Sequence, residues 1–216
     1  MSGAGFSFFP LLGKAGQEAG ISSCGSLLAA FAGLWTVGLA IRLMDDYLDA
    51  PVDLLQGVQT SAHHLGNASL PYALVGLSVG SLLSPKLTAA LFLSAYAIGM
   101  TSELTRALPS RLRGYQESLL AIVIGAIGAG PMVMAWALMT MFTIQALDDL
   151  IDLRVDSHID GRNWCHLFGV GEVILSGSLS VAFSAFLSPL LTGLTLLTAA
   201  SIGLIFHRQP GTVILK

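Results

Sequence analysis

Long stretches without a charged side chain constrain what this chain can fold into more than any other feature. Residues 119–147 form one such stretch, in which none of 29 consecutive residues is Asp, Glu, Lys or Arg. Charged residues make up 11% of the sequence and apolar residues 54%, against about 25% and about 45–50% in soluble globular domains. The mean hydropathy of +0.75 agrees. We therefore expect an integral membrane protein, and a net charge of −3 argues against a basic nucleic-acid-binding surface.

The apolar stretches divide into helices of membrane-spanning length. A bilayer core of about 30 Å needs roughly 17–25 apolar residues per helix. Such stretches lie at about 21–44, 68–84, 87–104, 165–187 and 190–206. The stretch 119–147 would give one helix of about 43 Å, too long for one crossing without strong tilt, and Gly130-Pro131 offers a turn at its middle. We predict two helices there, 113–130 and 131–152, and therefore an all-α polytopic transmembrane bundle of about seven helices.

The basic residues favour one orientation of this bundle. With a hairpin at Gly130-Pro131, eight of the ten basic residues fall on one face, and only Lys14 and Lys86 fall on the other. The eight are Arg42, Arg106, Arg111, Arg113, Arg154, Arg162, Arg208 and Lys216. Positively charged loops stay on the cytosolic side, so we expect this face to be cytosolic in the cell (inner) membrane.

An internal repeat of aspartates marks two related halves. Residues 41–53 read IRLMDDYLDAPVD and residues 144–156 read IQALDDLIDLRVD, with six of thirteen positions identical at an offset of 103. Each copy ends an apolar helix and is followed by a polar loop and two further spans. We predict a single integral-membrane domain over residues 1–216. It consists of an interfacial segment (1–20), a first half (21–110) and a second half (111–216).

The spacing of these aspartates suits cation and diphosphate chemistry. Positions three or four residues apart share a helical face, so Asp45, Asp49 and Asp53 form one acidic ridge. The second copy forms another ridge from Asp148, Asp152 and Asp156. Mg²⁺ characteristically bridges one or two carboxylates to phosphate oxygens, so two ridges with arginines nearby indicate a pyrophosphate site. A single motif of this kind is more often a solvated helix end. Pro51 can also end the first helix near residue 50.

At these motifs the sequence resembles the UbiA superfamily of intramembrane prenyltransferases, over residues 22–207. Residues 45–53 are similar to the first Asp-rich motif of that family, with Asp45 where asparagine is usual. Asp149, Asp152 and Asp156, with Asp148 alongside, are similar to the second, and three spans separate the two motif helices as in the family. The loop 105–114 and the stretch 161–169 occupy the places of the basic loop and of the glycine-basic stretch of the family.

The resemblance implies a helical bundle whose central cavity opens to the cytosol. It implies transfer of an isoprenyl group from an isoprenyl diphosphate to a small acceptor by Mg²⁺-assisted ionisation. The implied metal ligands are Asp45, Asp46, Asp49, Asp53, Asp148, Asp149, Asp152 and Asp156. The implied catalytic residues are Asp46, Asp49, Asp149, Asp152, Arg42 and Tyr47. The candidates for diphosphate binding are Arg106, Arg111, Arg113, Arg154 and Arg162.

Several alternatives stay open at this point. A membrane-embedded class I terpene cyclase would use the same two motifs and quench the cation internally. A divalent-cation transporter is less favoured, because transport sites lie near the midplane on broken helices, whereas these acids cluster at one end. Four aromatic residues, Tyr47, Tyr115, Trp136 and Trp164, are candidates to stabilise a carbocation, although packing is favoured for Trp136. His63-His64 is expected to be a solvated loop, and Cys165 a helix start rather than a nucleophile.

Overall fold

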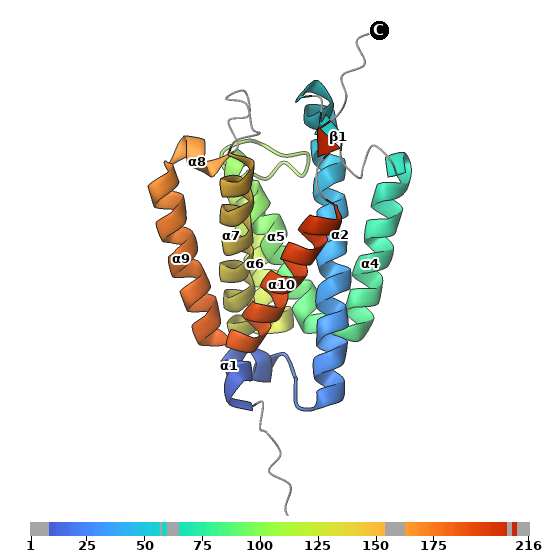
Figure 1. Cartoon of the computed structure of the whole chain (residues 1–216), viewed down its shortest axis with the longest axis vertical. Coiled ribbons are helices and arrows are strands. Elements are labelled where there is room, and N and C mark those ends of the chain that lie inside the picture. Colours follow the sequence, from blue (N-terminus) through green and yellow to red (C-terminus); the bar gives the residue numbers. More distant parts are fainter. Residues whose placement is uncertain (1–8, 57, 60–64, 154–162, 207–208, 211–216) are drawn as a thin grey trace, which may run out of the picture.

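The protein folds into a bundle of long helices that run up and down in alternation (Figure 1). The computed structural model describes residues 9–56, 58–59, 65–153, 163–206 and 209–210. The seven long helices are α2 (Cys24–Gln56), α4 (Ser69–Leu83), α5 (Pro85–Gly99), α6 (Gly114–Ala129), α7 (Pro131–Asp152), α9 (Val170–Leu187) and α10 (Pro189–Ile205). The prediction of an all-α fold is therefore confirmed for the described residues.

Shorter elements occupy the two ends of the bundle. Helix α1 (Phe9–Glu18) closes one end and is kinked at Gly13, whose φ is 59°. At the other end lie α8 (Trp164–Leu167) and the 3-10 turns η1 (Gly66–Ala68) and η2 (Met100–Glu103). The two-residue strands β1 (Val58–Gln59) and β2 (Gln209–Pro210) pair antiparallel beyond α2.

Three tight turns, each with a proline as the first residue of the next helix, connect antiparallel helices. They lie at Ser84-Pro85, Gly130-Pro131 and Ser188-Pro189. Proline suits this position because its missing N–H would have no intrahelical partner there. The predicted hairpin inside 119–147 is therefore confirmed. Helices α6 and α7 are separate and antiparallel.

Several helix boundaries differ from the predicted spans. Helix α2 continues past Pro51 to Gln56, so the alternative of an end near residue 50 is not realised and Asp53 lies on the helix. A proline removes one hydrogen bond from a helix, and the helical turns on either side of Pro51 persist without it. The helix predicted at 165–187 begins instead at Val170, because Gly169 adopts a φ of 103° and separates it from α8.

The interior of the bundle is apolar, and much of its outer surface is apolar as well. Trp136 is fully buried at the centre, where its Nε1 donates a hydrogen bond to Thr192 Oγ1 at 3.0 Å. Large apolar side chains project outward from α4, α6, α9 and α10, among them Leu82, Ile127 and Phe186. Within the described ranges, two helices, at Cys24–Ala50 and Val170–Leu187, are long and apolar enough to cross a membrane. Helices α6 and α10 are shorter apolar helices.

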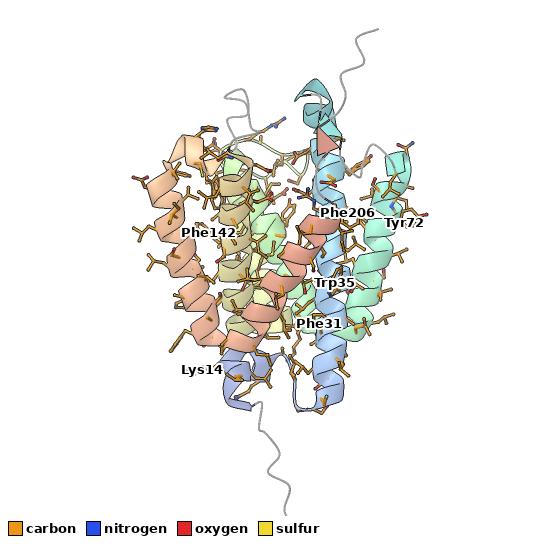
Figure 2. All side chains as sticks on the ribbon, viewed as in Figure 1. Lys14, Phe31, Trp35, Tyr72, Phe142 and Phe206 are labelled. Atoms are coloured by element: carbon orange, nitrogen blue, oxygen red, sulfur yellow. The ribbon has the colours of Figure 1, made fainter. Side chains whose placement is uncertain are left out.

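Both aspartate motifs lie at the same end of the bundle. Helices α2 and α7 run in the same direction, and the elements that follow them, β1 and α8, lie together at one end (Figure 1). Lys14 lies at the opposite end (Figure 2), where the Nζ of Lys86 also donates to the main-chain oxygen of Glu18 at 2.7 Å. The described parts of the chain thus agree with the predicted separation of the basic residues.

We expect Gly130→Ala to destabilise the hairpin. Gly130 has φ 109° and ψ 148°, a conformation that costs an L-residue about 1–3 kcal/mol. An added Cβ would also lie 2.4 Å from Cδ of Glu18, whose Oε2 accepts hydrogen bonds from the N–H groups of Met132 and Val133. The matched control is Gly128→Ala, which meets no atom within 4 Å. Thermal unfolding should show a lowered midpoint for Gly130→Ala alone, and equal midpoints for both variants would contradict this.

Candidate functional site

A cavity of about 190 Å³ lies inside the motif end of the bundle. Its walls come from four helices, α2, α5, α7 and α10, each of which contacts the next to form a closed ring. Helix α10 lies obliquely between α7 and α2 (Figure 1). The deeper lining is apolar, whereas the mouth carries Arg42, Asp45, Gln145 and Asp148. The cavity thus combines an apolar interior with a charged entrance.

The two motifs contribute equivalent residues to this mouth. Asp45 and Asp148, the first aspartates of the two copies, both line the cavity. Arg42 and Gln145, three residues earlier in each copy, line it as well. Each motif helix therefore brings its first aspartate to the same cavity.

The second aspartate of each copy is buried beside the cavity. Asp46 is 1% exposed, and its Oδ1 lies 3.2 Å from the Nε of Arg42. Asp149 is 7% exposed, and its Oδ1 accepts a hydrogen bond of 2.8 Å from the Nε2 of Gln145. Each buried carboxylate is thus held by the residue one helical turn before it. Such pairing is what a carboxylate needs in an apolar interior.

Asp149 also anchors the short helix α8. Its Oδ2 accepts a hydrogen bond of 2.8 Å from the main-chain N–H of Trp164. The side chain of Asn163 donates to the main-chain oxygen of Asp149 at 2.9 Å and accepts from the N–H of Cys165 at 2.8 Å. Cys165 therefore lies in the first turn of α8, which begins one residue earlier at Trp164. Burial, and next the charge of Asp149, raise the pKa of its thiol, which disfavours a nucleophilic thiolate.

The remaining predicted aspartates lie around this centre. Asp49 and Asp152 are half-buried, one helical turn beyond Asp45 and Asp148. Asp53 lies on α2, and its side chain is outside the described part of the chain. Asp156, Arg154, Arg162 and His63-His64 lie outside the described residues altogether.

Three predicted diphosphate-binding arginines share one loop at the motif end. Arg106, Arg111 and Arg113 are exposed, and the loop folds back on itself through a bridge between Ala107 and Arg113. Arg111 has a φ of 69°. None of the three is among the described residues that line the cavity. The structure thus brings them to the correct end without placing them in the cavity wall.

The aromatic candidates are not placed in the cavity wall. Tyr47 is 39% exposed, and two residues of helix turn it about 200° away from Asp45, which lines the cavity. Tyr115 is exposed and Trp136 is buried in the core, as its packing role predicts. Trp164 packs against Phe142 with ring centroids 4.8 Å apart. No aromatic residue occurs in the lining that the structure describes, so a role of Tyr47 beside a reacting group stays a prediction.

Sequence reasoning missed the apolar walls that α5 and α10 contribute. They line the cavity at paired positions, Leu91 with Thr195, Ala95 with Ala199, Ile98 with Ile202 and Gly99 with Gly203, all at an offset of 104. The signal that could have found them is the repeated sequence L-S-P-x-L-T at 83–88 and 187–192, which has the same offset. The duplication therefore extends from the motif helices to all four walls.

The oxygen donors at the mouth could hold a divalent cation if water and phosphate oxygens completed its coordination shell. The described residues contain no cluster of three or more His, Cys, Asp or Glu side chains arranged to hold a metal ion. Mg²⁺ commonly takes only one or two carboxylates and completes its shell with water and substrate phosphates, and Asp45 and Asp148 supply such a pair. Asp149, in contrast, uses its oxygens for Gln145 and Trp164.

No match was found for this chain among protein-family models, curated proteins or solved structures. Its function must therefore be argued from the cavity itself.

We expect Asp149→Ala to loosen α8. The variant leaves the N–H of Trp164 without its acceptor, and an unsatisfied buried group costs about 1–3 kcal/mol. The measurement is the rate of thiol alkylation at Cys165 in a Cys24→Ser background, together with the unfolding midpoint. Asp148→Ala, which removes a neighbouring carboxylate at the cavity, is the control and should leave the alkylation rate unchanged. If the two variants alkylate at the same rate, Asp149 does not anchor α8.

Proposed function

We propose that this chain is an integral-membrane transferase of the UbiA type that moves an isoprenyl group from an isoprenyl diphosphate to a small acceptor. The observation that carries the proposal is the cavity. Its interior is apolar, and two carboxylates from equivalent motif positions, Asp45 and Asp148, stand at its mouth beside Arg42. A molecule with a charged head and an apolar tail matches a cavity with a charged mouth and an apolar interior.

The outer surface supports a location inside a bilayer. Leu82, Ile127, Phe186 and Leu204 are each at least 77% exposed, although such side chains bury favourably away from water. Their helices α4 and α10 carry no charged residue, and α6 and α9 carry one each, near the motif end. In the proposed arrangement all seven long helices cross the membrane and the motif end faces the cytosol.

In this proposal the residues at the mouth have different roles in binding the diphosphate. Arg42 supplies positive charge to the diphosphate, while Asp45 and Asp148 would hold Mg²⁺ against it. Mg²⁺ would stabilise the negative charge that develops on the departing pyrophosphate. The apolar walls exclude water from the isoprenyl chain. Thr195 and Thr198 donate their hydroxyl hydrogens to the main-chain oxygens of Leu191 and Leu194, both at 2.8 Å, so these protons are engaged within α10.

The test of the proposal is pyrophosphate release from geranylgeranyl diphosphate in the presence of Mg²⁺. We expect the wild type to release pyrophosphate, and Asp45→Asn and Asp148→Asn to slow the release by about 10²-fold, the usual cost of one electrostatic contact to a developing charge. Glu172→Gln removes an exposed carboxylate on α9 and serves as the control. Unchanged release in both aspartate variants would refute the site. Abundant terpene hydrocarbon or alcohol in the absence of an acceptor would assign a cyclase instead.

We also expect the carboxylates to make diphosphate binding depend on Mg²⁺ in a defined way. Asp45 and Asp148 repel an anion when no cation is present, so removal of Mg²⁺ with a chelator should abolish binding to the wild type. The double variant Asp45→Asn/Asp148→Asn lacks this repulsion. Without Mg²⁺ it should bind diphosphate more tightly than the wild type does, and Mg²⁺ should no longer improve its affinity. Titration calorimetry with inorganic pyrophosphate measures both effects, and an equal Mg²⁺ dependence in the two proteins would contradict the prediction.

A further inference from the structure

The two halves of the cavity are equivalent in position but differ in composition. Helix α2 lines the cavity with Gly38 and Arg42, where α7 has Met141 and Gln145. Both pairs follow the offset of 103 that relates the motifs. The differences therefore fall on two successive turns of the same helical face, and both make the α2 side roomier or more positive.

The depth of the cavity shows the same bias. On α2 the lining extends from Asp45 down to Leu34, about 16 Å along the helix at 1.5 Å per residue. On α7 it extends from Asp148 only to Met141, about 10 Å. The position on α7 that corresponds to Leu34 is Ala137, which is buried in the core and does not line the cavity.

Gly38 lines the cavity at a position where side chains of α10 come close to α2. A Cβ at residue 38 would lie 2.9 Å from Cδ1 of Ile202 and 3.7 Å from Cγ2 of Thr198, and both of those residues line the cavity from α10. The end of the Ile202 side chain can move by a few tenths of an ångström, so alanine fits with adjustment. A methionine at residue 38 would fill the passage, as Met141 does on the opposite side.

Arg42 supplies a positive charge on this same side of the cavity. Its Nε is held by Asp46 at 3.2 Å, and a guanidinium carries five N–H donors in a fork, so the Nη atoms can still reach a phosphate. At the equivalent position Gln145 is neutral and donates to Asp149. Arg42→Gln therefore introduces the residue that pairs with the second aspartate in the other half.

We propose that the ligand lies on the α2 side of the cavity, with its anionic head on Arg42 and its apolar chain running past Gly38 toward Leu34. Met141 and Gln145 exclude it from the α7 side. This inference rests on the proposed function for the chemistry of the ligand and adds to it the residues that select chain length.

The test uses saturated alkyl diphosphates of increasing chain length, which lack the allylic double bond and therefore bind without ionising. Binding is measured by calorimetry with Mg²⁺ present. Arg42→Gln should weaken every chain length by the same factor, about 10- to 100-fold, because it removes only a contact to the head group. Lys14→Gln, at the opposite end of the bundle, is the charge control and should bind as the wild type does.

Variants at residue 38 and at its counterpart, residue 141, test the contribution of the alkyl chain to affinity separately from that of the diphosphate head group. Gly38→Met should leave the affinity for the shortest alkyl diphosphates unchanged and remove the rise in affinity with alkyl length. Gly38→Ala should reduce this rise to a smaller degree. Met141→Gly should retain the gain. If Gly38→Met does not fold, Gly38→Ala and Met141→Gly decide the question. Equal length dependence in Gly38→Ala and the wild type, or loss of long-chain binding in Met141→Gly, would overturn the proposal.

The same proteins distinguish the two proposals. If alkyl diphosphates follow the expected pattern and allylic diphosphates release no pyrophosphate, the transferase proposal fails and the placement of the ligand stands. If pyrophosphate is released but Arg42→Gln and Gly38→Ala bind all chains as the wild type does, the placement fails and the transferase proposal stands.

Discussion

Each motif helix is rotated in the bundle so that the carboxylate of its second aspartate is buried, an arrangement that is costly unless the carboxylate is paired. Asp46 and Asp149 are almost inaccessible to solvent, and a carboxylate in such surroundings requires a partner. Both find it one helical turn earlier, at Arg42 and Gln145. With those positions set, the helical rotation of about 100° per residue leaves the first aspartate of each motif at the cavity mouth. The first aspartates are thus positioned by neighbours that are paired within their own helices, Asp46 by an ion pair with Arg42 and Asp149 by a hydrogen bond from Gln145.

The duplication turns this local arrangement into a cavity. The first half contributes α2, α4 and α5, and the second contributes α7, α9 and α10, with α6 between them. Helix α5 contacts α7 and α10 contacts α2, so each half closes the ring against the other half. Ser84-Pro85 and Ser188-Pro189 make turns of the same kind, with the N–H of each serine donating to the carbonyl four residues before it. Equal turns place equal faces of α5 and α10 toward the centre, which explains why their lining residues pair at a constant offset.

The sequence predicted most of the fold because its signals were local. Charge-free stretches, helix-starting prolines and Gly130 at the middle of 119–147 specify where helices begin and end, and the structure agrees at all three tight turns. The motif repeat predicted that two acidic helix ends would share one side. It could not predict which aspartates reach the cavity, because that depends on the rotation of each helix in the bundle. Asp149 bonds to Trp164, fifteen residues away, and the spacing of the motif contains no sign of that contact.

The residues that line the cavity are of two kinds, those that both halves share and those that only one half has. Asp45 and Asp148 are equivalent positions of the two halves and both line the charged mouth of the cavity, where two negative charges repel each other unless a proton or a cation offsets them. Arg42 and Gly38 occur in one half only, and a ligand with a single head and a single chain needs one side of the cavity, not two. A duplicated framework produces equivalent walls by default. The residues that break this equivalence along α2 are therefore the ones through which a directional ligand can be recognised.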